Sequence, residues 1–538
     1  MATCHCPEPA QCHHRPLLPT AAGYPKLHDR PRPAPGSALA EVAAILRLTG
    51  PMVGAGILFY MRSLVSMVFL GRLGQLPLAG GSLALGFANI TGYSVLSGLA
   101  GGMDPVCGQA FGAGRTDLLR AALRRTVLLL LAASVPIGML WVAMHRVLVS
   151  TGQDADIAAT AYAYILCCLP DLVVQCFLHP IRIYLRAQSV TLPLTYGAAA
   201  ALLLHVPINF LLVSVLGLGI RGVALGGVWT NLNFLLFLVA YVYFRGMYGA
   251  HDDDGGGAKK GAPPAEEEEE EREGASREWW SLVRLCVHSC MSVCLEWWWY
   301  EIMVLLCGVL IDPKAAVAAM GVLIQTTSLI YIFPHSLGCA VSTRVGHELG
   351  TGRPERARLV ARVGLGLGAA LGLVACAFAV SVRGVWARMF TTDEAILRLA
   401  AAALPLLGLA ELGNCPQTAG CGVLRGSARP EKAARINVSA FYGVGMPVAL
   451  ALAFWPAGLD FRGMWGGMLA AQLVCAALML RAVLGTDWME QTERARQLTG
   501  GRGDGLDVAG IVDEDKTSHA KPAKAEVGNT LFMVADCV

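Results

Sequence analysis

Apolar segments long enough to cross a membrane recur along nearly the whole chain. A helix needs about 20 residues to span the hydrocarbon of a bilayer. Because an unpaired backbone amide is costly in lipid, such segments are expected to be helical. We therefore predict an all-α, polytopic membrane protein. Its twelve transmembrane helices are predicted at residues 40–68, 79–103, 121–145, 157–179, 190–216 and 222–245, and at 282–310, 315–343, 358–381, 395–424, 433–456 and 463–485.

The composition agrees with this class and excludes an ordinary soluble domain. Hydrophobic residues make up 55% of the chain and charged residues 15%, with a mean hydropathy of +0.53. The 17 cysteines lie mostly inside apolar segments, where cysteine packs as a small hydrophobe. No zinc-protease, nucleophile-elbow or phosphate-loop motif is present, so we do not expect an enzyme.

Polar stretches divide the chain into five parts. Residues 1–39 are Pro-rich and polar, and a run of Glu at 266–271 follows a Gly-rich stretch, which is typical of flexible segments. Cysteines and histidines near the start have ligand chemistry, but in so short a tail we expect no bound metal. The predicted parts are a disordered cytosolic tail (1–39), a six-helix bundle (40–245), a flexible acidic cytosolic linker (246–281), a second six-helix bundle (282–485) and a disordered cytosolic tail (486–538).

Arginine is concentrated in the loops that follow even-numbered segments, and the other loops are poorer in basic residues. Basic loops stay on the cytosolic side, so both termini and the linker are predicted to be cytosolic. The loop residues that carry this prediction are Arg115, Arg120, Arg124 and Arg125 after the second segment, Arg182 and Arg186 after the fourth, Arg344, Arg353, Arg356, Arg358 and Arg362 after the eighth, and Arg425, Arg429, Lys432 and Arg435 after the tenth.

The chain repeats itself. Gly108-Gln-Ala-Phe-Gly-Ala-Gly-Arg115 matches Gly346-His-Glu-Leu-Gly-Thr-Gly-Arg353, and Leu-Arg186-Ala-Gln matches Leu-Arg425-Gly-Ser. Each half holds an even number of helices, so the halves are expected to relate by a pseudo-two-fold axis along the membrane normal. Small residues let helices approach closely. We expect the repeated motif to form equivalent gates or hinges on the cytosolic side, built from Gly108, Gly112, Gly114 and Arg115 and from Gly346, Gly350, Gly352 and Arg353.

Two carboxylates lie inside one apolar segment. Glu296 and Glu301 flank three tryptophans and Tyr300. Charged groups at membrane depth are rare and usually face a bundle interior or a wet cavity. The alternative is an interfacial tryptophan belt with the acids reaching water. The two acids are about 140° apart around a helix, so one should face the central cavity and the other the bundle interior. Trp297 and Trp298 share a face with Glu301, and Tyr300 shares one with Glu296.

These motifs together resemble the multidrug and toxic compound extrusion (MATE) family, in its plant-type DETOXIFICATION branch. The residues that carry the resemblance are Asp104-Pro-Val-Cys-Gly-Gln109-Ala-Phe-Gly112-Ala, Cys294-Leu-Glu296-Trp-Trp-Trp-Tyr-Glu301 and Gly422-Val-Leu-Arg425-Gly. The similarity covers about residues 40–485. The resemblance implies transporters that export organic cations, drugs, metabolites or hormones in exchange for protons. It also favours Glu296 as the coupling site, with Glu301 next.

The sequence departs from this family in helix 10. Many plant-type relatives carry an Asp in a D-x-x-Q pattern there, whereas this chain has Asn414, followed by Gln417. An amide does not titrate, so Asn414 cannot carry the coupling proton. Glu411 lies about one turn earlier on roughly the same face, and we predict that it replaces the missing acid.

Other polar residues in apolar segments are weaker candidates for lining the cavity, because hydrogen bonds within or between helices explain them equally well. Together with the aromatic residues beside the acids, the predicted lining comprises Trp297, Trp298, Tyr300, Asn89, Thr91, Gln109, Gln325, Asn414 and Gln417.

The function expected from these features is secondary active export of organic, often cationic, molecules by two rocking bundles. The coupling ion would be the proton, with no cofactor, and the partners would be a small organic substrate and the bilayer, without nucleic acid. We expect a monomer in the plasma membrane or an endomembrane such as the vacuole or late endosome. The alternatives are a flippase for a lipid-linked headgroup, which would need basic residues in its cavity, and a non-transporting receptor or scaffold.

Overall fold

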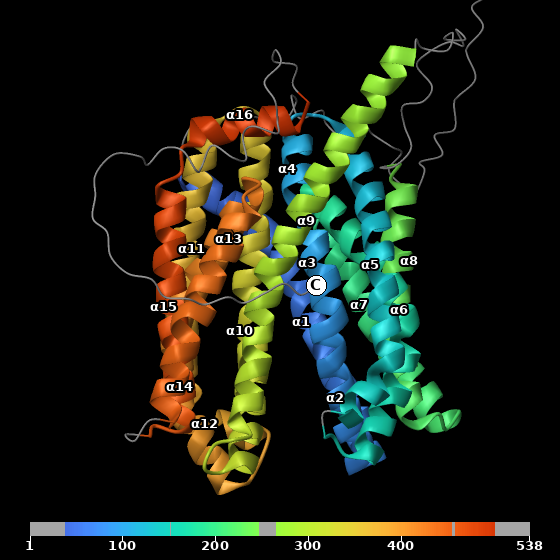
Figure 1. Cartoon of the computed structure of the whole chain (residues 1–538), viewed down its shortest axis with the longest axis vertical. Helices are drawn as coiled ribbons and strands as arrows, with labels where there is room; N and C mark the ends of the chain where they lie inside the picture. The colour runs from blue at the N-terminus through green and yellow to red at the C-terminus, as the bar shows by residue number, and fades with distance from the viewer. Residues whose placement is uncertain (1–37, 151, 247–264, 455–457, 501–538) are drawn as a thin grey trace, which may run out of the picture.

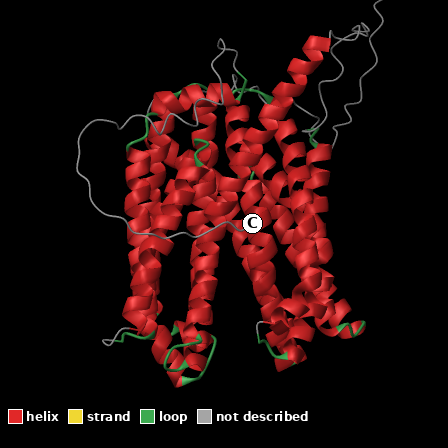
Figure 2. Ribbon diagram, viewed as in Figure 1, coloured by secondary structure: helices red, strands yellow, loops and turns green. Residues whose placement is uncertain are grey.

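The computed structural model describes residues 38–150, 152–246, 265–454 and 458–500, with backbone only for 265–275. All regular structure in these ranges is helical (Figure 2). Within the described residues, twelve helical spans are long and apolar enough to cross a membrane, which confirms the predicted class and number. Most of the two predicted tails, and residues 247–264 of the predicted linker, lie outside the described residues.

The N-terminal half contains the first six spans. Pro and Asp mark several helix starts in both halves; for example, Asp154 accepts hydrogen bonds from the backbone N–H groups of Asp156 and Ile157. The elements are α1 (Ala38–Leu73), α2 (Gln75–Ala88), a π-helical turn (Asn89–Tyr93), α3 (Ser94–Gly101), α4 (Met103–Gly112), α5 (Thr116–Ser150), α6 (Ala155–Ala187), α7 (Leu192–Asn209) with a π-helical end (Phe210–Val215), and α8 (Gly219–Phe244).

The C-terminal half repeats this order and adds a short last helix. Its elements are α9 (Ala265–Cys307), α10 (Pro313–Gly350), α11 (Pro354–Val382), a 3-10 turn (Trp386–Met389), α12 (Glu394–Gly426), α13 (Pro430–Asn437), a π-helical segment (Val438–Gly445), α14 (Met446–Phe454), α15 (Phe461–Leu484) and α16 (Trp488–Leu498).

The two halves form two helix groups that lie together at one end of the molecule and diverge towards the other (Figure 1). The end at which α16 lies is called the α16 end below. The first helix of each half crosses towards the other half: Leu48 of α1 packs with Val341 and Val345 of α10, while Cys286 of α9 packs in the N-terminal core. This reciprocal exchange is what a pseudo-two-fold axis requires.

Several boundaries differ from the sequence prediction. Arg182 and Arg186, assigned to a loop, lie inside α6, and α9 begins within the predicted linker. Residues 486–500, assigned to a disordered tail, contain α16. The reason is that hydropathy detects only the lipid-facing length of a helix, whereas these helices continue past it and α16 is amphipathic.

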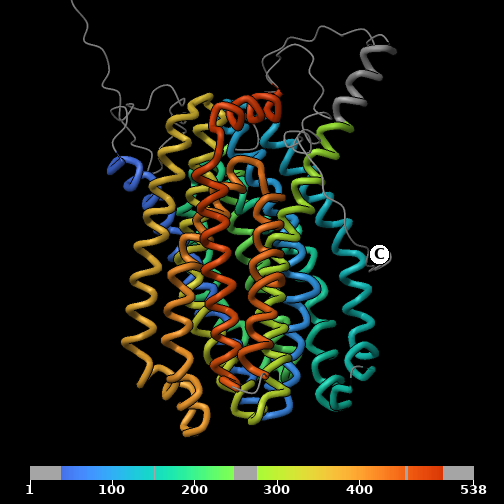
Figure 3. The backbone as a smooth tube through the Cα atoms, turned by 60° about the vertical axis from the view of Figure 1, so that its left-hand side comes forward, coloured from blue at the N-terminus to red at the C-terminus, as the bar shows by residue number. Residues whose placement is uncertain are grey.

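Helix α16 lies across one end of the molecule in Figure 3 and contacts both halves. Trp488 and Ala495 pack in a core cluster with α10 and α11 of the C-terminal half. Leu498 packs on the N-terminal core, and Arg115 donates a hydrogen bond to the Thr499 carbonyl oxygen at 2.8 Å. A neighbouring turn is also tied to the chain just before α16, because Arg429 donates to the Thr486 hydroxyl.

Candidate functional site between the bundles

The repeated glycine motifs contact each other at the α16 end. A Cβ placed on Gly346 would lie 3.1 Å from the Cα of Gly108, its counterpart in the repeat. A Cβ on Gly112 would collide with the His347 carbonyl oxygen, and one on Gly350 would collide with the Gln109 carbonyl oxygen. Since Gln109 and His347 are also counterparts, the contact is two-fold symmetric. The two predicted motifs therefore form one shared, closed contact.

Hydrogen bonds repeat the same symmetry. Gln109 Nε2 donates to the Gly426 carbonyl oxygen at 3.0 Å, and His347 Nε2 donates to the Ala187 carbonyl oxygen at 2.7 Å. Gln109 was predicted to line a cavity, but it is buried in this inter-bundle contact. Gly114 and Gly352 have positive φ angles of 74° and 73°, so both end their helices in the left-handed region that glycine adopts without strain.

One carboxylate holds two symmetry-related arginines beside this contact. Arg186 Nη2 lies 2.7 Å from Asp104 Oδ1, and Arg425 Nη1 lies 3.8 Å from Asp104 Oδ2. Ser342, the counterpart of Asp104 in the repeat, donates to the same carboxylate at 3.2 Å. These residues join α4 and α6 of the first half to α10 and α12 of the second. The ion pairs therefore help to hold the bundles together at the α16 end.

Acidic side chains of α9 and α12 gather inside the C-terminal bundle. Glu296 and Glu411 are both buried, 8% and 2% exposed, and interact electrostatically with each other. Asn414 Nδ2 donates to Glu411 Oε2 at 2.9 Å. The side chain of Glu296 lies near that of Gln417 and interacts electrostatically with His335 and Arg425. The structure thus brings together four residues that the sequence singled out, two acids and two amides.

The aromatic stretch between the acids divides between two environments. Trp299 is fully buried against Phe441, with ring centroids 5.7 Å apart. Trp297 and Trp298 are exposed in this structure, and Trp298 Nε1 donates to the Ile90 carbonyl oxygen of the N-terminal bundle at 3.2 Å. Tyr300 interacts electrostatically with Glu411 and Glu296.

Glu301 lies apart from the acid pair. Its side chain is half-buried, and no hydrogen bond or ion pair of Glu301 is found within the described ranges. This agrees with the expectation that the two acids of α9 occupy different faces.

The remaining predicted lining residues are dispersed. Asn89 and Gln325 are exposed. Thr91 donates to the Phe87 carbonyl oxygen at 2.6 Å and accepts from Trp141 Nε1 at 2.9 Å, so its hydroxyl is engaged within the N-terminal bundle.

Sequence reasoning missed other polar groups of the acid cluster. Gln472 of α15 packs against Gly413 beside Glu411 and is buried, yet both of its amide atoms lack a hydrogen-bond partner in the described part of the chain. Cys339 Sγ lies 3.7 Å from His335 Nε2 and 4.0 Å from Arg425 Nη1. The available signal was a lone polar residue in each apolar segment, which does not by itself identify its neighbours.

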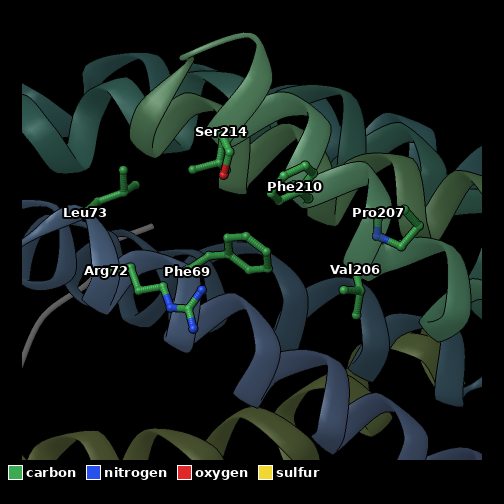
Figure 4. A pocket seen from close by; sticks show the side chains of 8 residues that line it. Phe69, Arg72, Leu73, Val206, Pro207, Phe210 and Ser214 are labelled. Carbon is green, nitrogen blue, oxygen red and sulfur yellow. The ribbon is translucent and has the colours of Figure 1, made fainter.

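A cavity of about 640 Å³ lies far from these acids, near the end opposite α16. Figure 4 shows Phe69, Arg72 and Leu73 of α1 facing Phe210 and Ser214, which follow α7. It includes none of the predicted site residues, so it is separate from the acid cluster.

Comparisons with known proteins agree with this geometry. The family model described as MatE matches residues 51–211 and 289–451, one block in each half. Protein DETOXIFICATION 49 of Arabidopsis thaliana is 53% identical over 487 residues, covering 90% of this chain and 94% of the relative. Protein DETOXIFICATION 52 of the same plant is 53% identical over 459 residues, covering 85% and 87%.

Solved structures share the fold. The crystal structure of the eukaryotic MATE transporter AtDTX14 superposes with a TM-score of 0.76 at 29% identity, covering 86% of this chain and 99% of that chain. A structure described as an outward-facing conformation of a multidrug resistance MATE family transporter gives a TM-score of 0.70 at 17% identity, covering 86% and 97%, and supports the fold alone.

Proposed function

Because this chain belongs to the multidrug and toxic compound extrusion family of membrane transporters, we propose that it exports small organic molecules in exchange for protons. The buried pair Glu296 and Glu411 is the observation that carries the proposal. Two interacting carboxylates away from water need a proton or a cationic group to balance their charge. A site of this kind can bind a proton and a cationic group in turn, and so exchange one for the other.

The proposed coupling step occurs at Glu296. The carboxylate lies near the Gln417 side chain, in the field of His335 and Arg425. While Glu296 is charged, it attracts a cationic or hydrogen-bond-donating group of the cargo. A proton that enters from the outer side neutralises the carboxylate, removes that attraction and releases the cargo.

Glu411 takes the second position in this proposal. Asn414, where the family pattern carries an acid, donates to Glu411 Oε2, so the amide orients the carboxylate without titrating. The acid is shifted by three residues, which keeps it within a turn of the same helix face. Glu301, half-buried and apart from the pair, would contribute attraction near Trp297 and Trp298 rather than coupling.

Alternating access follows from the closed contact at the α16 end. We propose that this end faces the cytosol, as the arginine distribution predicts, and that the structure represents the state closed to the cytosol. Cargo loading requires the glycine contact around Gly108 and Gly346 and the ion pairs of Asp104 to separate. The proposal includes a monomer as the working unit, since each monomer carries both bundles.

The test is transport by the purified protein in liposomes under an imposed pH gradient. Wild-type protein should move a cationic dye in the direction opposite to proton flow, driven by the proton gradient. Glu296→Gln should fold normally but lose most of this gradient-driven flux. Arg221→Gln, on the exposed surface of α8, is the control. Gradient-driven flux that persists in Glu296→Gln would contradict the assignment of Glu296.

A further inference from the structure

Arg182 of α6 is a half-buried guanidinium without an acidic partner. Within the described ranges it makes no hydrogen bond and no ion pair. Its guanidinium carbon lies 5.4 Å from the centroid of the Phe59 ring, its one defined partner. The charged and ionisable groups around it are His179 and Arg186 on its own helix, Arg62 of α1 and Cys339 of α10. Interaction with Cys339 places Arg182 on the side of α6 that meets the other bundle.

Each neighbouring arginine has a carboxylate, bound directly or through an amide, that balances its charge. Arg186 pairs with Asp104, which Arg425 also approaches. Arg62 donates to Asn231 Oδ1, and Asn231 Nδ2 in turn donates to Asp171 Oδ1 at 2.8 Å, so an amide links that arginine to a carboxylate. Arg182 is therefore the one cation of this group whose charge is left without a balancing acid among the described residues.

The position of Arg182 suits cargo binding. It lies one turn from Arg186, whose ion pair belongs to the closed α16 end, on the side towards the middle of the membrane. It is about 16 Å along the helix axis from Asp171, which lies at the centre of α6. Arg62 approaches the same aromatic ring, with its guanidinium carbon 5.8 Å from the Phe59 centroid. Two guanidinium groups on one aromatic ring form a planar, positively charged surface.

A partly buried arginine without a partner is costly to maintain. Arginine binds carboxylates in a bidentate geometry, so a carboxylate-bearing ligand would remove that cost. The acid cluster of the opposite bundle is linked to this surface, since Glu296 interacts with Arg425, and Arg425 Nη1 lies 4.0 Å from Cys339 Sγ. The inter-bundle region thus offers an acid on one side and an unpaired guanidinium on the other.

We propose that the cargo of this transporter carries a carboxylate-type acidic group, bound by Arg182 beside Arg62 and Phe59, as well as a donor group directed towards Glu296. The preferred substrates are then aromatic zwitterions or organic acids, while a simple organic cation, which would meet Glu296 but not Arg182, is carried less efficiently. The inference rests on the proposed function, because it assumes that cargo passes between the bundles.

The experiment compares three probes with one aromatic scaffold: 2-phenylethylamine, phenylalanine and N-acetylphenylalanine. Uptake into liposomes is measured for wild type, Arg182→Gln and Arg182→Lys, with Arg221→Gln as the control. Arg182→Gln should lower flux of the two acids at least tenfold and flux of the amine less than twofold. Arg182→Lys keeps the charge and should recover part of the acid flux.

Binding without any gradient provides a second readout. N-acetylphenylalanine should raise the melting temperature of wild type and of Cys339→Ser, but not of Arg182→Gln. An equal rise in wild type and Cys339→Ser would show that the Cys339 side chain does not compete with the ligand for Arg182.

Three results would overturn the proposal: a wild type that carries only the amine, an equal loss of all three probes in Arg182→Gln, or the absence of both acid transport and acid binding in wild type. The equal loss would assign Arg182 to the closed contact instead. Failure of proton coupling alone, with acid binding intact, would refute the proposed function and leave this inference standing.

Discussion

Gly108 and Gly346 occupy the same position in the two halves of the chain, and they touch each other. A Cβ on either residue would lie 3.5 Å or less from the Cα of the other. Equivalent positions meet in this way only at a two-fold axis. The internal repeat therefore does more than show duplication, because its best-matched residues form the seam between the bundles.

Gly350→Ala should weaken the closed contact at the α16 end. Its methyl group would collide with the Gln109 carbonyl oxygen, a backbone atom that cannot easily move aside. Overpacking of this kind costs about 1–3 kcal/mol, so the open population should rise about fivefold or more. Distances between spin labels at residues 116 and 354 would measure the opening. Gly366→Ala, at a position with open space around it, is the matched control and should change nothing.

Asp104→Asn should destabilise the protein, because it leaves Arg186 and Arg425 without their shared carboxylate. Removing one partner of a buried ion pair costs about 3–5 kcal/mol. Thermal unfolding in detergent would report the loss. Ser342→Ala removes a single hydrogen bond to the same carboxylate and should cost about 1 kcal/mol.

Ser342→Asp in the Asp104→Asn background tests the pseudo-symmetry directly. Residue 342 is the counterpart of 104 and lies beside the same carboxylate, so an acid there should reach the same two arginines. We expect the double variant to recover a substantial part of the lost thermal stability. A double variant that is less stable than Asp104→Asn would show that the two positions are not interchangeable.

Glu411→Gln should flatten the pH dependence of transport, since the amide cannot titrate. In the wild type, the amide of Asn414 donates a hydrogen bond to Glu411. Asn414→Asp in the Glu411→Gln background places an acid at this position, three residues after 411. Part of the pH dependence should return. The measurement is initial flux in liposomes between pH 5.5 and 8, with wild type and Arg221→Gln as references. An unchanged profile in Glu411→Gln would leave coupling to Glu296 alone.

The sequence predicts the spans and the repeat well because both depend on local composition. Runs of apolar residues mark the twelve helices, and a motif recurs whether or not its copies meet. The proximity of Glu411 and Asn414 could also be predicted, since they are one turn apart on one helix.

Contacts between helices are a different matter. No sequence pattern indicated that Asp104 serves arginines from both halves, or that Gln472 lies beside the acids. Arg182 was assigned to a loop because α6 continues past the apolar run that defines it. Its lack of an acidic partner becomes visible only when the neighbours on α1 and α10 are known.

Helix α16 has a mechanical consequence for any change of state. Trp488 is embedded in a core of the C-terminal half, while Leu498 and the Thr499 carbonyl oxygen are held by the N-terminal half. Because α16 is attached to both bundles, it limits how far they can separate at this end before the contacts to one of them break. The full chain and a chain shortened before Trp488 should therefore differ in transport rate even if both bind the same cargo. A fusion partner joined close to residue 500 would act on the same contacts of α16.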